Sequence, residues 1–466
     1  MEYINGIENV VFPKSYIPED TLVAQLEFAL KYDGINLEIL KAIFNAIVEV
    51  GNITEFRQYI LKHPTGKYAR KLWFLYEFLL DTQLSIPKVS KGNYIDLLET
   101  DKYFTCKTIK SSRHRINNNL LGNRDICPVV RRTSEIKRFL SKRLQNQVKD
   151  VVAQYDDDVI TRASQYLHIK ETKSSFKLDS EQLSQNRTNR LIDVLRRSAT
   201  TININKEMLI ELQNHIVDQR FTESDYRKTQ NYVGEKLGGH RENIRYIAPR
   251  PEDVESCMEG LFKNIERMKK SHVDFIVQAA VIAFSFLFIR PFEDGNGRLH
   301  RFLIHQTLAK TGFLQKDCVI PISSVMLADQ RQYNDCLEDF YQKTLLLIDY
   351  KFKRNDVLVV KNETADHYRY HDSTRVVEYL FDVIEKTIQE NFISELSFVA
   401  EYNKTIVDFK NVVDMPDNLI IEFIKASLDN NKKSSKSKHN HFISVLSKVE
   451  IIQLEEIIDR NFSGVS

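Results

Sequence analysis

The stretch Arg290–Arg301 reads Arg-Pro-Phe-Glu-Asp-Gly-Asn-Gly-Arg-Leu-His-Arg, and the interpretation of the whole chain starts from it. Gly295 and Gly297 flank an asparagine, and their lack of side chains lets a ligand approach the backbone closely. Residues 299–312 are expected to form a helix, so the loop leads into a helix N-terminus with free amides and a positive dipole end. This combination predicts a loop that binds phosphate groups.

The charged side chains of the same stretch favour that interpretation. Asp294 offers a carboxylate that can hold Mg²⁺ against phosphate oxygens. Arg298 and Arg301 lie three residues apart, which brings them to one face of a helix, and arginine pairs with phosphate through two parallel hydrogen bonds.

Three other interpretations of the stretch were weighed. Asp-Gly-Asn-Gly taken alone is typical of an ordinary turn. An EF-hand loop is excluded, because placing Gly297 at its sixth position makes Phe292 the first calcium ligand. A P-loop is excluded as well, because the chain contains no Gly-x-x-x-x-Gly-Lys-(Ser/Thr) pattern.

Composition indicates a helical protein that is neither strongly basic nor membrane-spanning. The 466 residues include only 14 glycines and 10 prolines, and the net charge is +2. The five cysteines are scattered without a Cys-x-x-Cys pair, so neither a disulfide framework nor a zinc site is expected. The longest apolar run, Phe275–Ile289, is too short to span a bilayer, and a cytoplasmic location is expected.

The chain is expected to consist of four segments. They are an N-terminal helical region (1–130), a basic helical connector (131–172), a central domain (173–350) and a C-terminal helical region (351–466). Within the central domain, short alternating runs on either side of Gly238-Gly239 predict a β-hairpin.

The stretch resembles the signature of the Fic family, His-x-Phe-x-(Asp/Glu)-Gly-Asn-Gly-Arg-x-x-Arg, at every specified position except the first, where Arg290 stands. Residues 227–234 and 246–251 resemble the family's hairpin flap, which aligns a target segment over the active site. Residues 329–334 resemble the helix that borders the adenosine end of the pocket. The resemblance implies a mainly α-helical fold, with a multi-helix Fic core, a short β-hairpin flap and helical N- and C-terminal regions.

Fic enzymes typically transfer AMP from Mg-ATP to a hydroxyl of a target protein. The resemblance therefore implies ATP and Mg²⁺ as cofactors and, as partner, a protein with an acceptor Ser, Thr or Tyr hydroxyl; a membrane is not expected, and a homodimer is compatible with the sequence. The resemblance implies metal binding by Asp294 and catalytic roles for Asn296 and Arg298. It implies that the nucleotide is bound by Gly295, Asn296, Gly297, Arg298, Arg301, Tyr333 and Asn334. The flap that aligns the target would consist of Gln230, Asn231, Tyr232, Val233 and Gly234.

The position of the catalytic base departs from the family pattern. The family's histidine takes the proton from the attacking hydroxyl, a task that suits an imidazole. An arginine guanidinium stays protonated and has no acceptor lone pair, so Arg290 cannot serve as that base. General-base catalysis contributes roughly 10²- to 10⁴-fold, so we expect reduced or lost transfer.

A second departure concerns the inhibitory helix that many Fic proteins carry, with the pattern (Ser/Thr)-x-x-x-Glu-(Gly/Asn). Its glutamate pairs with the second motif arginine and obstructs the γ-phosphate. Here the corresponding residues are Ser175 and Asp179, with aspartate in place of glutamate. The alternative is that this segment is a polar loop preceding a helix.

Three functions are left open by the sequence. The protein is a weakened adenylyltransferase, or a catalytically inactive Fic fold that binds nucleotide or a partner protein, or a nucleic-acid-binding regulator. The last alternative rests on the basic segments Lys107–Arg115, Arg131–Lys149 and Lys432–Lys438, which are better explained as solvated surfaces.

Overall fold

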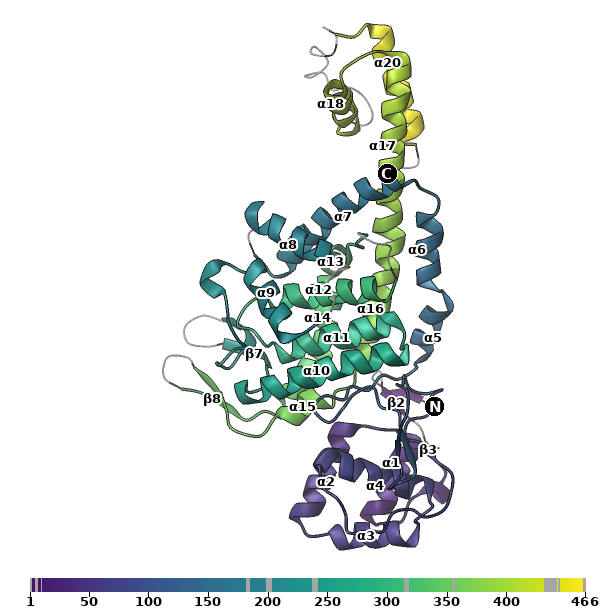
Figure 1. The fold of residues 1–466 in the computed structure, drawn as a ribbon, viewed down its shortest axis with the longest axis vertical. Coiled ribbons are helices and arrows are strands. Elements are labelled where there is room, and N and C mark those ends of the chain that lie inside the picture. Colours follow the sequence, from purple (N-terminus) through teal and green to yellow (C-terminus); the bar gives the residue numbers. More distant parts are fainter. Residues whose placement is uncertain are drawn as a thin grey trace. The chain divides into compact units, whose positions relative to one another are not determined.

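The computed structural model describes all of the chain except residues 1, 5–6, 10, 182–184, 198–202, 237–241, 314–317, 354–356, 431–441, 443–444 and 464–466. The fold is mainly α-helical with short strands, as the sequence predicts (Figure 1). It divides into two compact units: the first comprises residues 1–136, 223–296 and 336–377, and the second comprises residues 137–222, 297–335 and 378–466. The four sequence segments stay a prediction.

The first unit contains the helices α1 (Leu22–Tyr32), α2 (Leu37–Glu49), α3 (Ile53–Lys62), α4 (Lys67–Leu80), α10 (Pro251–Ser271), α11 (Phe275–Ile289) and α15 (Ala365–Arg369), and the 3₁₀ turn η1 (Lys14–Tyr16). Its strands are β1 (Glu2–Ile4), β2 (Ile7–Asn9), β3 (Ile95–Asp96), β4 (Ile109–Ser111), β5 (Ile116–Asn118), β6 (Tyr232–Lys236), β7 (Glu242–Ile247), β8 (Tyr350–Phe352) and β9 (Leu358–Val360). Three antiparallel pairs, β1–β2, β6–β7 and β8–β9, accompany a three-stranded sheet in the order β3-β5-β4.

The second unit contains α6 (Leu144–Val152), α7 (Asp157–Leu178), α8 (Gln185–Arg197), α9 (Lys206–Ile216), the 3₁₀ turn η2 (Gln219–Phe221), α13 (Ile322–Ala328), the π-helical η4 (Thr387–Phe392), α17 (Ile393–Val412), α18 (Asp417–Leu428) and α20 (Lys448–Asn461). The helices α5 (Ser134–Ser141), α12 (Asn296–Lys310), α14 (Gln330–Leu345) and α16 (Thr374–Lys386) each continue across a boundary between the units.

The first helical stretch of the connector is two helices, α5 and α6. It breaks at Arg143, which has a φ of +50° and precedes α6. A residue in the left-handed conformation cannot continue a right-handed α-helix, and residue-type propensities do not predict this conformation for an arginine.

The apolar run of the sequence is the most deeply buried helix of the first unit. Every α11 residue from Ile276 to Ile289 is buried, and α11 lies beside α10 (Figure 1). Asp274 begins the helix, because its carboxylate accepts hydrogen bonds from the amides of Ile276 (2.9 Å) and Val277 (3.2 Å). Within the described residues, no helix combines the length and apolar character needed to cross a bilayer.

The basic segments are largely engaged by the protein itself. Arg115 donates to the carbonyls of Ser90 (3.0 Å) and Gly92 (2.7 Å), and Arg132 donates to the carbonyl of Tyr103 (3.1 Å). These arginines bind loops together within the first unit. The third segment, 432–438, lies outside the described residues.

A buried carboxylate stabilises the N-terminal helices. Glu77 on α4 pairs with Arg113 (2.9 Å) and His114 (3.0 Å), and it accepts a hydrogen bond from the indole of Trp73 (2.7 Å). Burial alone would raise the pKa of Glu77, but the hydrogen bonds from these neighbours outweigh it and lower the pKa to about 2.

Replacing Glu77 with glutamine is expected to destabilise this region by about 3 kcal/mol at neutral pH, because Arg113 loses its buried partner. The folded-state pKa lies below the usual value, so the stabilisation is present above pH 4.5 and disappears as pH falls toward 2. Trp73 is the sole tryptophan, so its fluorescence during urea unfolding reports this cluster. Exposed Glu55 is the control, and equal effects of Glu77→Gln and Glu55→Gln would contradict the prediction.

Candidate functional site

The site is built on the loop between α11 and α12. The first unit holds the loop up to Asn296, and the second begins at Gly297, one residue into α12. The helix begins three residues earlier than the sequence predicts, so Arg298 lies in its first turn.

Arg290 ends α11 in a strained backbone conformation. Its φ is +48° and its ψ is 64°, and its amide donates to the carbonyl of Phe286 at 3.0 Å. This left-handed region usually holds glycine at a helix end. Arg227, which is 3% exposed, fixes the turn by donating from Nε to the carbonyl of Arg290 (2.7 Å) and from its backbone amide to the carbonyl of Pro291 (2.8 Å).

The side chain of Arg290 is held by the flap. Its Nε donates to the Oδ1 of Asn231 at 2.9 Å. The guanidinium also lies close to Tyr341: burial raises the pKa of that phenol to about 12, and the positive charge of Arg290 opposes the rise. The group at the base position is therefore a cation anchored within the first unit.

The predicted hairpin flap is present as β6 and β7. Tyr232 pairs with Ile247, and a bulge between Val233 and Gly234 shifts the register. A Cβ at Gly234 would lie 3.0 Å from the carbonyl oxygen of residue 243, so only glycine fits there without movement. The Gly238-Gly239 turn lies outside the described residues.

Two amides join the start of the flap to its surroundings. Asn231 donates to the carbonyls of Phe292 and Glu293, both at 3.3 Å. Gln230 donates to the carbonyl of Ala248 at 2.6 Å. Of the flap residues named from the sequence, Asn231 thus contacts the loop, and the role of the flap stays a prediction.

The loop is pinned from inside by Asn296. Its side chain accepts from the amide of Phe292 (3.1 Å) and donates to the carbonyl of Phe292 (2.7 Å). Phe292 is fully buried and packs edge-on against Tyr226. Gly295 adopts a φ of +88°, which justifies a glycine at this turn. In this structure Asn296 therefore shapes the loop backbone.

Carboxylates gather at the tip of the loop. Asp294 Oδ1 accepts from the amide of Gly295 at 2.6 Å, and Glu223 Oε1 accepts from the amide of Glu293 at 2.9 Å. Burial raises the pKa of Glu223 to about 7, and the charges of Glu293 and Asp294 add to the rise. Sequence reasoning missed Glu223, because no local pattern connects it to a loop seventy residues away.

These residues fit Mg²⁺ only as part of a metal–nucleotide complex. Within the described part of the chain, no group of three or more His, Cys, Asp or Glu side chains could hold a metal by itself. Mg²⁺ commonly uses one or two carboxylates together with phosphate oxygens and waters. Asp294 offers one such carboxylate.

In the second unit, α7 and α12 pair their side chains in antiparallel register. Three residues spaced four apart at the end of α7 face three residues of α12. Glu171 contacts His305, Ser175 contacts Arg301, and Asp179 lies against Gly297. Residues four apart lie on one face of a helix, so one face of α7 and its C-cap Asp179 meets one face of α12. Ser175 lies inside α7, so the alternative of a polar loop at this position is wrong.

Arg301 is enclosed by the end of α7. Its exposed fraction is 2%, and it donates to the hydroxyl of Ser175 (2.7 Å), the carbonyl of Ser175 (2.9 Å) and Asp179 Oδ2 (2.9 Å). Burial alone would lower the pKa of Arg301, but the adjacent Asp179 carboxylate raises it above the usual range.

Arg298 is held by a second carboxylate that sequence reasoning missed. Its Nη2 lies 2.6 Å from Glu181 Oε1, its Nε lies 3.4 Å from Asp179 Oδ2, and its Nη1 donates to the carbonyl of Ile216 at 3.0 Å. Glu181 also pairs with Arg187. Asp179 and Glu181, named here the carboxylate pair, thus occupy both arginines of the motif.

Asp179 also lies against the first turn of α12. A Cβ added to Gly297 would lie 2.7 Å from Asp179 Oδ1. A carboxylate at a helix N-terminus is favoured by the free amides and the helix dipole. The position expected for an anion is therefore occupied by the protein's own anion.

The remaining predicted residues lie on α14. Tyr333 is buried, and it is close enough to Arg301 to contribute to the raised pKa of that arginine. Asn334 follows it on the same helix and is half-buried.

His305, one turn beyond Arg301, pairs with Glu171 at 2.9 Å, and Glu171 accepts a hydrogen bond from the amide of Ser323 at 2.8 Å. This buried link fastens α7 to α12 and α13.

Several solved structures are similar to this chain. A Fic domain containing signaling protein from Bacteroides thetaiotaomicron matches at a TM-score of 0.40 and 16% identity, over 57% of this chain and 97% of that chain. A Fic family protein from Desulfovibrio desulfuricans matches at 0.37 and 16%, over 69% and 84%. Fic-1 from C. elegans matches at 0.32 and 14%, over 55% and 74%. TM-scores this low carry no argument about the chain.

The family model of the Fic/DOC family matches residues 203–308. This range contains the flap, α10, α11, the loop and most of α12, and it excludes the carboxylate pair. The chain therefore contains a domain that matches the Fic/DOC family, at residues 203–308.

Proposed function

We propose that this protein binds Mg-ATP at residues 294–301 and belongs to the Fic proteins that transfer AMP to a hydroxyl of a target protein, with that transfer reduced or lost because Arg290 stands at the base position. The observation that carries the proposal is the burial of Arg298 and Arg301 and their pairing with carboxylates. Both are at most 2% exposed, and both are paired with carboxylates beside the N-terminus of α12.

Two buried arginines at a helix N-terminus suit a polyanion better than they suit a plain structural role. Guanidinium groups pair with phosphate as they pair with carboxylate, through parallel hydrogen bonds. The amides of the first turn of α12 add to the attraction for phosphate. The triphosphate of ATP therefore competes with the carboxylate pair for the same cations, and the resting protein has low affinity for the nucleotide.

The chain's own residues have separate tasks in this proposal. Asp294 binds the metal of Mg-ATP, which neutralises phosphate charge when it is bound. Asn296 holds the loop backbone in shape, and the flap at residues 230–234 aligns the segment of the target that bears the hydroxyl. Tyr333 and Asn334 border the adenosine. Arg290 cannot accept the proton of the hydroxyl, so the transfer step lacks its base.

The proposal is tested by equilibrium binding of a fluorescent ATP analogue in the presence of Mg²⁺. Arg298→Ala is expected to weaken binding by about tenfold or more, because a charge-assisted hydrogen bond contributes about 1.5–3 kcal/mol. Exposed Arg196 on α8 provides the control Arg196→Ala. Equal binding by the parent protein and Arg298→Ala would show that the loop is not the nucleotide site.

The metal position gives a separate prediction. Asp294→Asn is expected to remove the enhancement of ATP binding by Mg²⁺, weakening Mg-ATP binding at least about tenfold while leaving metal-free ATP binding nearly unchanged. Glu293→Gln changes the adjacent exposed carboxylate and is the matched control. The measurement is a Mg²⁺ titration at fixed nucleotide concentration. Loss of the enhancement in the control alone would place the metal elsewhere.

A further inference from the structure

A small cavity in the first unit encloses a buried lysine. The cavity has a volume of 180 Å³ and lies among residues of α1, of α4 and of the segment that follows β3. We call it the Lys71 cavity. Its charged lining residues are Lys31, Asp33, Lys71, Glu99, Lys102 and Arg131, so four cations face two carboxylates.

Lys71 is buried without an acidic partner. It is 5% exposed, and within the described residues no hydrogen bond or ion pair engages its ammonium group. The nearest carboxylate, Glu99, is already used: one of its oxygens lies 2.8 Å from Lys67, and the other lies 2.8 Å from Lys102. Buried lysines are almost always paired, so an unpaired lysine that lines a cavity is a position that suits a bound anion.

Burial and a neighbouring cation disfavour the charged form of Lys71. Burial lowers the pKa of Lys71 to about 8, and the positive charge of Lys67 adds to the decrease. Glu99 opposes the decrease only partly. An anion bound within hydrogen-bonding distance would favour the charged ammonium and offset the cost of burying it.

Arg131 further prepares the cavity for an anion. It donates a hydrogen bond to the carbonyl of Asp33 at 2.9 Å, and this carbonyl lies at the C-terminal end of α1. Helix C-termini repel anions, so this contact reduces the main unfavourable feature of the lining. The hydroxyl oxygen of Tyr103 accepts a hydrogen bond from the amide of Ile35 at 3.0 Å. The hydroxyl hydrogen can therefore be donated to another group.

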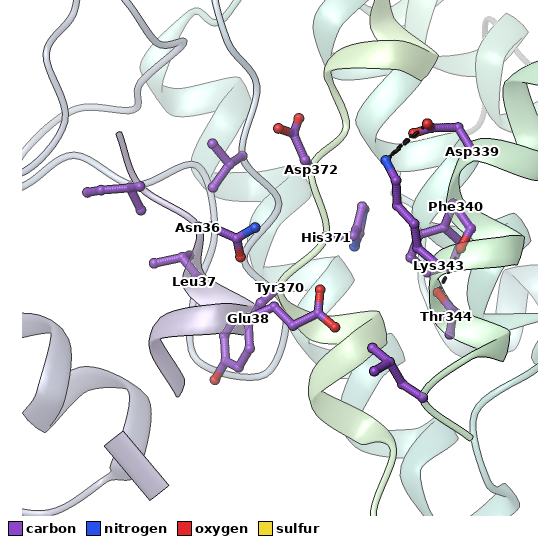
Figure 2. A pocket seen from close by; sticks show the side chains of 13 residues that line it. Asn36, Leu37, Glu38, Asp339, Phe340, Lys343, Thr344, Tyr370, His371 and Asp372 are labelled. Atoms are coloured by element: carbon purple, nitrogen blue, oxygen red, sulfur yellow. Dashed lines mark hydrogen bonds and ion pairs between the residues drawn. The ribbon is translucent and has the colours of Figure 1, made fainter. Parts of the chain in front are cut away.

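A second cavity of the same unit is lined by a lysine that is exposed and paired. The volume of this cavity is 270 Å³. Figure 2 shows Lys343 turned toward Asp339, and the two form an ion pair of 3.0 Å. Its buried His371 contacts the carbonyl of Tyr368 (2.9 Å) and the hydroxyl of Ser285 (3.2 Å). The charged lysine of this second cavity has a carboxylate partner, whereas Lys71 lacks one.

We propose that the Lys71 cavity binds a small anion, a phosphate or carboxylate group of a small molecule, which pairs with the ammonium of Lys71. The site is independent of the loop at residues 290–301 and of the function proposed for it. Lys102 and Lys31 at the lining attract the anion, and Tyr103 donates to it.

The test uses inorganic phosphate, with chloride and acetate at equal ionic strength. The full chain is treated at pH 8 with a small amine-reactive reagent, and the modified lysines are mapped by mass spectrometry. Phosphate at four times its Kd is expected to slow modification of Lys71 about fivefold. Exposed Lys62 should react at an unchanged rate. Protection of Lys71 by acetate and not by phosphate would also support the proposal, with a carboxylate as the bound anion.

Thermal unfolding supplies the second readout. Lys71→Met keeps the length of the side chain and removes the unpaired charge, so it should fold and should raise the Tm without added anion. The comparison is made in the Arg298→Ala background, in which the proposed nucleotide site is impaired. Phosphate should raise the Tm of Arg298→Ala and should not raise that of Arg298→Ala/Lys71→Met, so in the next comparison these two variants stand for the parent and for Lys71→Met. The proposal is overturned if neither phosphate nor acetate protects Lys71, or if phosphate stabilises Lys71→Met as much as the parent.

Discussion

Arg290→His is expected to raise AMP transfer from Mg-ATP by about 10²- to 10⁴-fold, because it supplies the general base that the chain lacks. The backbone should accept the change. Residue 290 has a φ of +48°, and histidine is among the residues enriched in that left-handed region. The carbonyl of residue 290 stays fixed by Arg227, so the new imidazole is presented from the same turn.

The measurement is incorporation of label from α-labelled ATP into the protein itself and into lysate proteins. It should be made in the parent background and in Asp179→Ala/Glu181→Ala, because the carboxylate pair occupies the arginines that bind phosphate. The full increase in AMP transfer by Arg290→His is expected in the Asp179→Ala/Glu181→Ala background.

Arg290→Gln is the matched control for this experiment. It removes the cation and keeps a group that can hydrogen bond to Asn231, but it provides no base at neutral pH. If the parent protein labels as strongly as Arg290→His, another group accepts the proton. If Arg290→Gln labels as strongly as Arg290→His, the positive charge of Arg290 silences the site and the missing base does not.

Asp179→Ala/Glu181→Ala is expected to lower the stability of the nucleotide-free protein by about 3–5 kcal/mol, because it leaves Arg298 and Arg301 buried without their carboxylates. Mg-ATP should restore much of this loss, since ligand that binds only the folded state stabilises it by mass action. The rise in Tm with Mg-ATP should therefore be larger for this variant than for the parent.

The measurement is thermal unfolding across a range of Mg-ATP concentrations. The control Asp193→Ala/Glu207→Ala removes two exposed carboxylates from the same unit and makes the same change in net charge. A variant that is as stable as the parent, or that responds to Mg-ATP no more than this control, would show that the carboxylate pair does not close a phosphate site.

The parts of the site that depend on local chemistry could be predicted from the sequence. Glycine at residue 295 is suited to the positive φ that the turn adopts, and the apolar run at 275–289 predicts a helix buried on most of its sides. The contact of Asp179 with Arg301 follows the family's inhibitory pattern, although aspartate is one methylene shorter than glutamate.

The rest depends on contacts that the fold makes between distant residues. Glu181 reaches Arg298 across 117 residues, and Glu223 reaches the amide of Glu293 across 70. Neither glutamate lies in a pattern that distinguishes it from a surface residue. The break at Arg143 and the left-handed Arg290 are likewise set by packing, because residue-type propensity assigns such conformations to glycine.

The most direct test of the central claim is a calorimetric titration of Mg-ATP into the parent protein and into Asp179→Ala/Glu181→Ala. The claim is that residues 294–301 form an intact phosphate site which the carboxylate pair occupies. It predicts binding at least about tenfold tighter in the variant, equivalent to about 1.4 kcal/mol released when the competing carboxylates are removed. Equal affinities, or no binding by either protein, would contradict the claim.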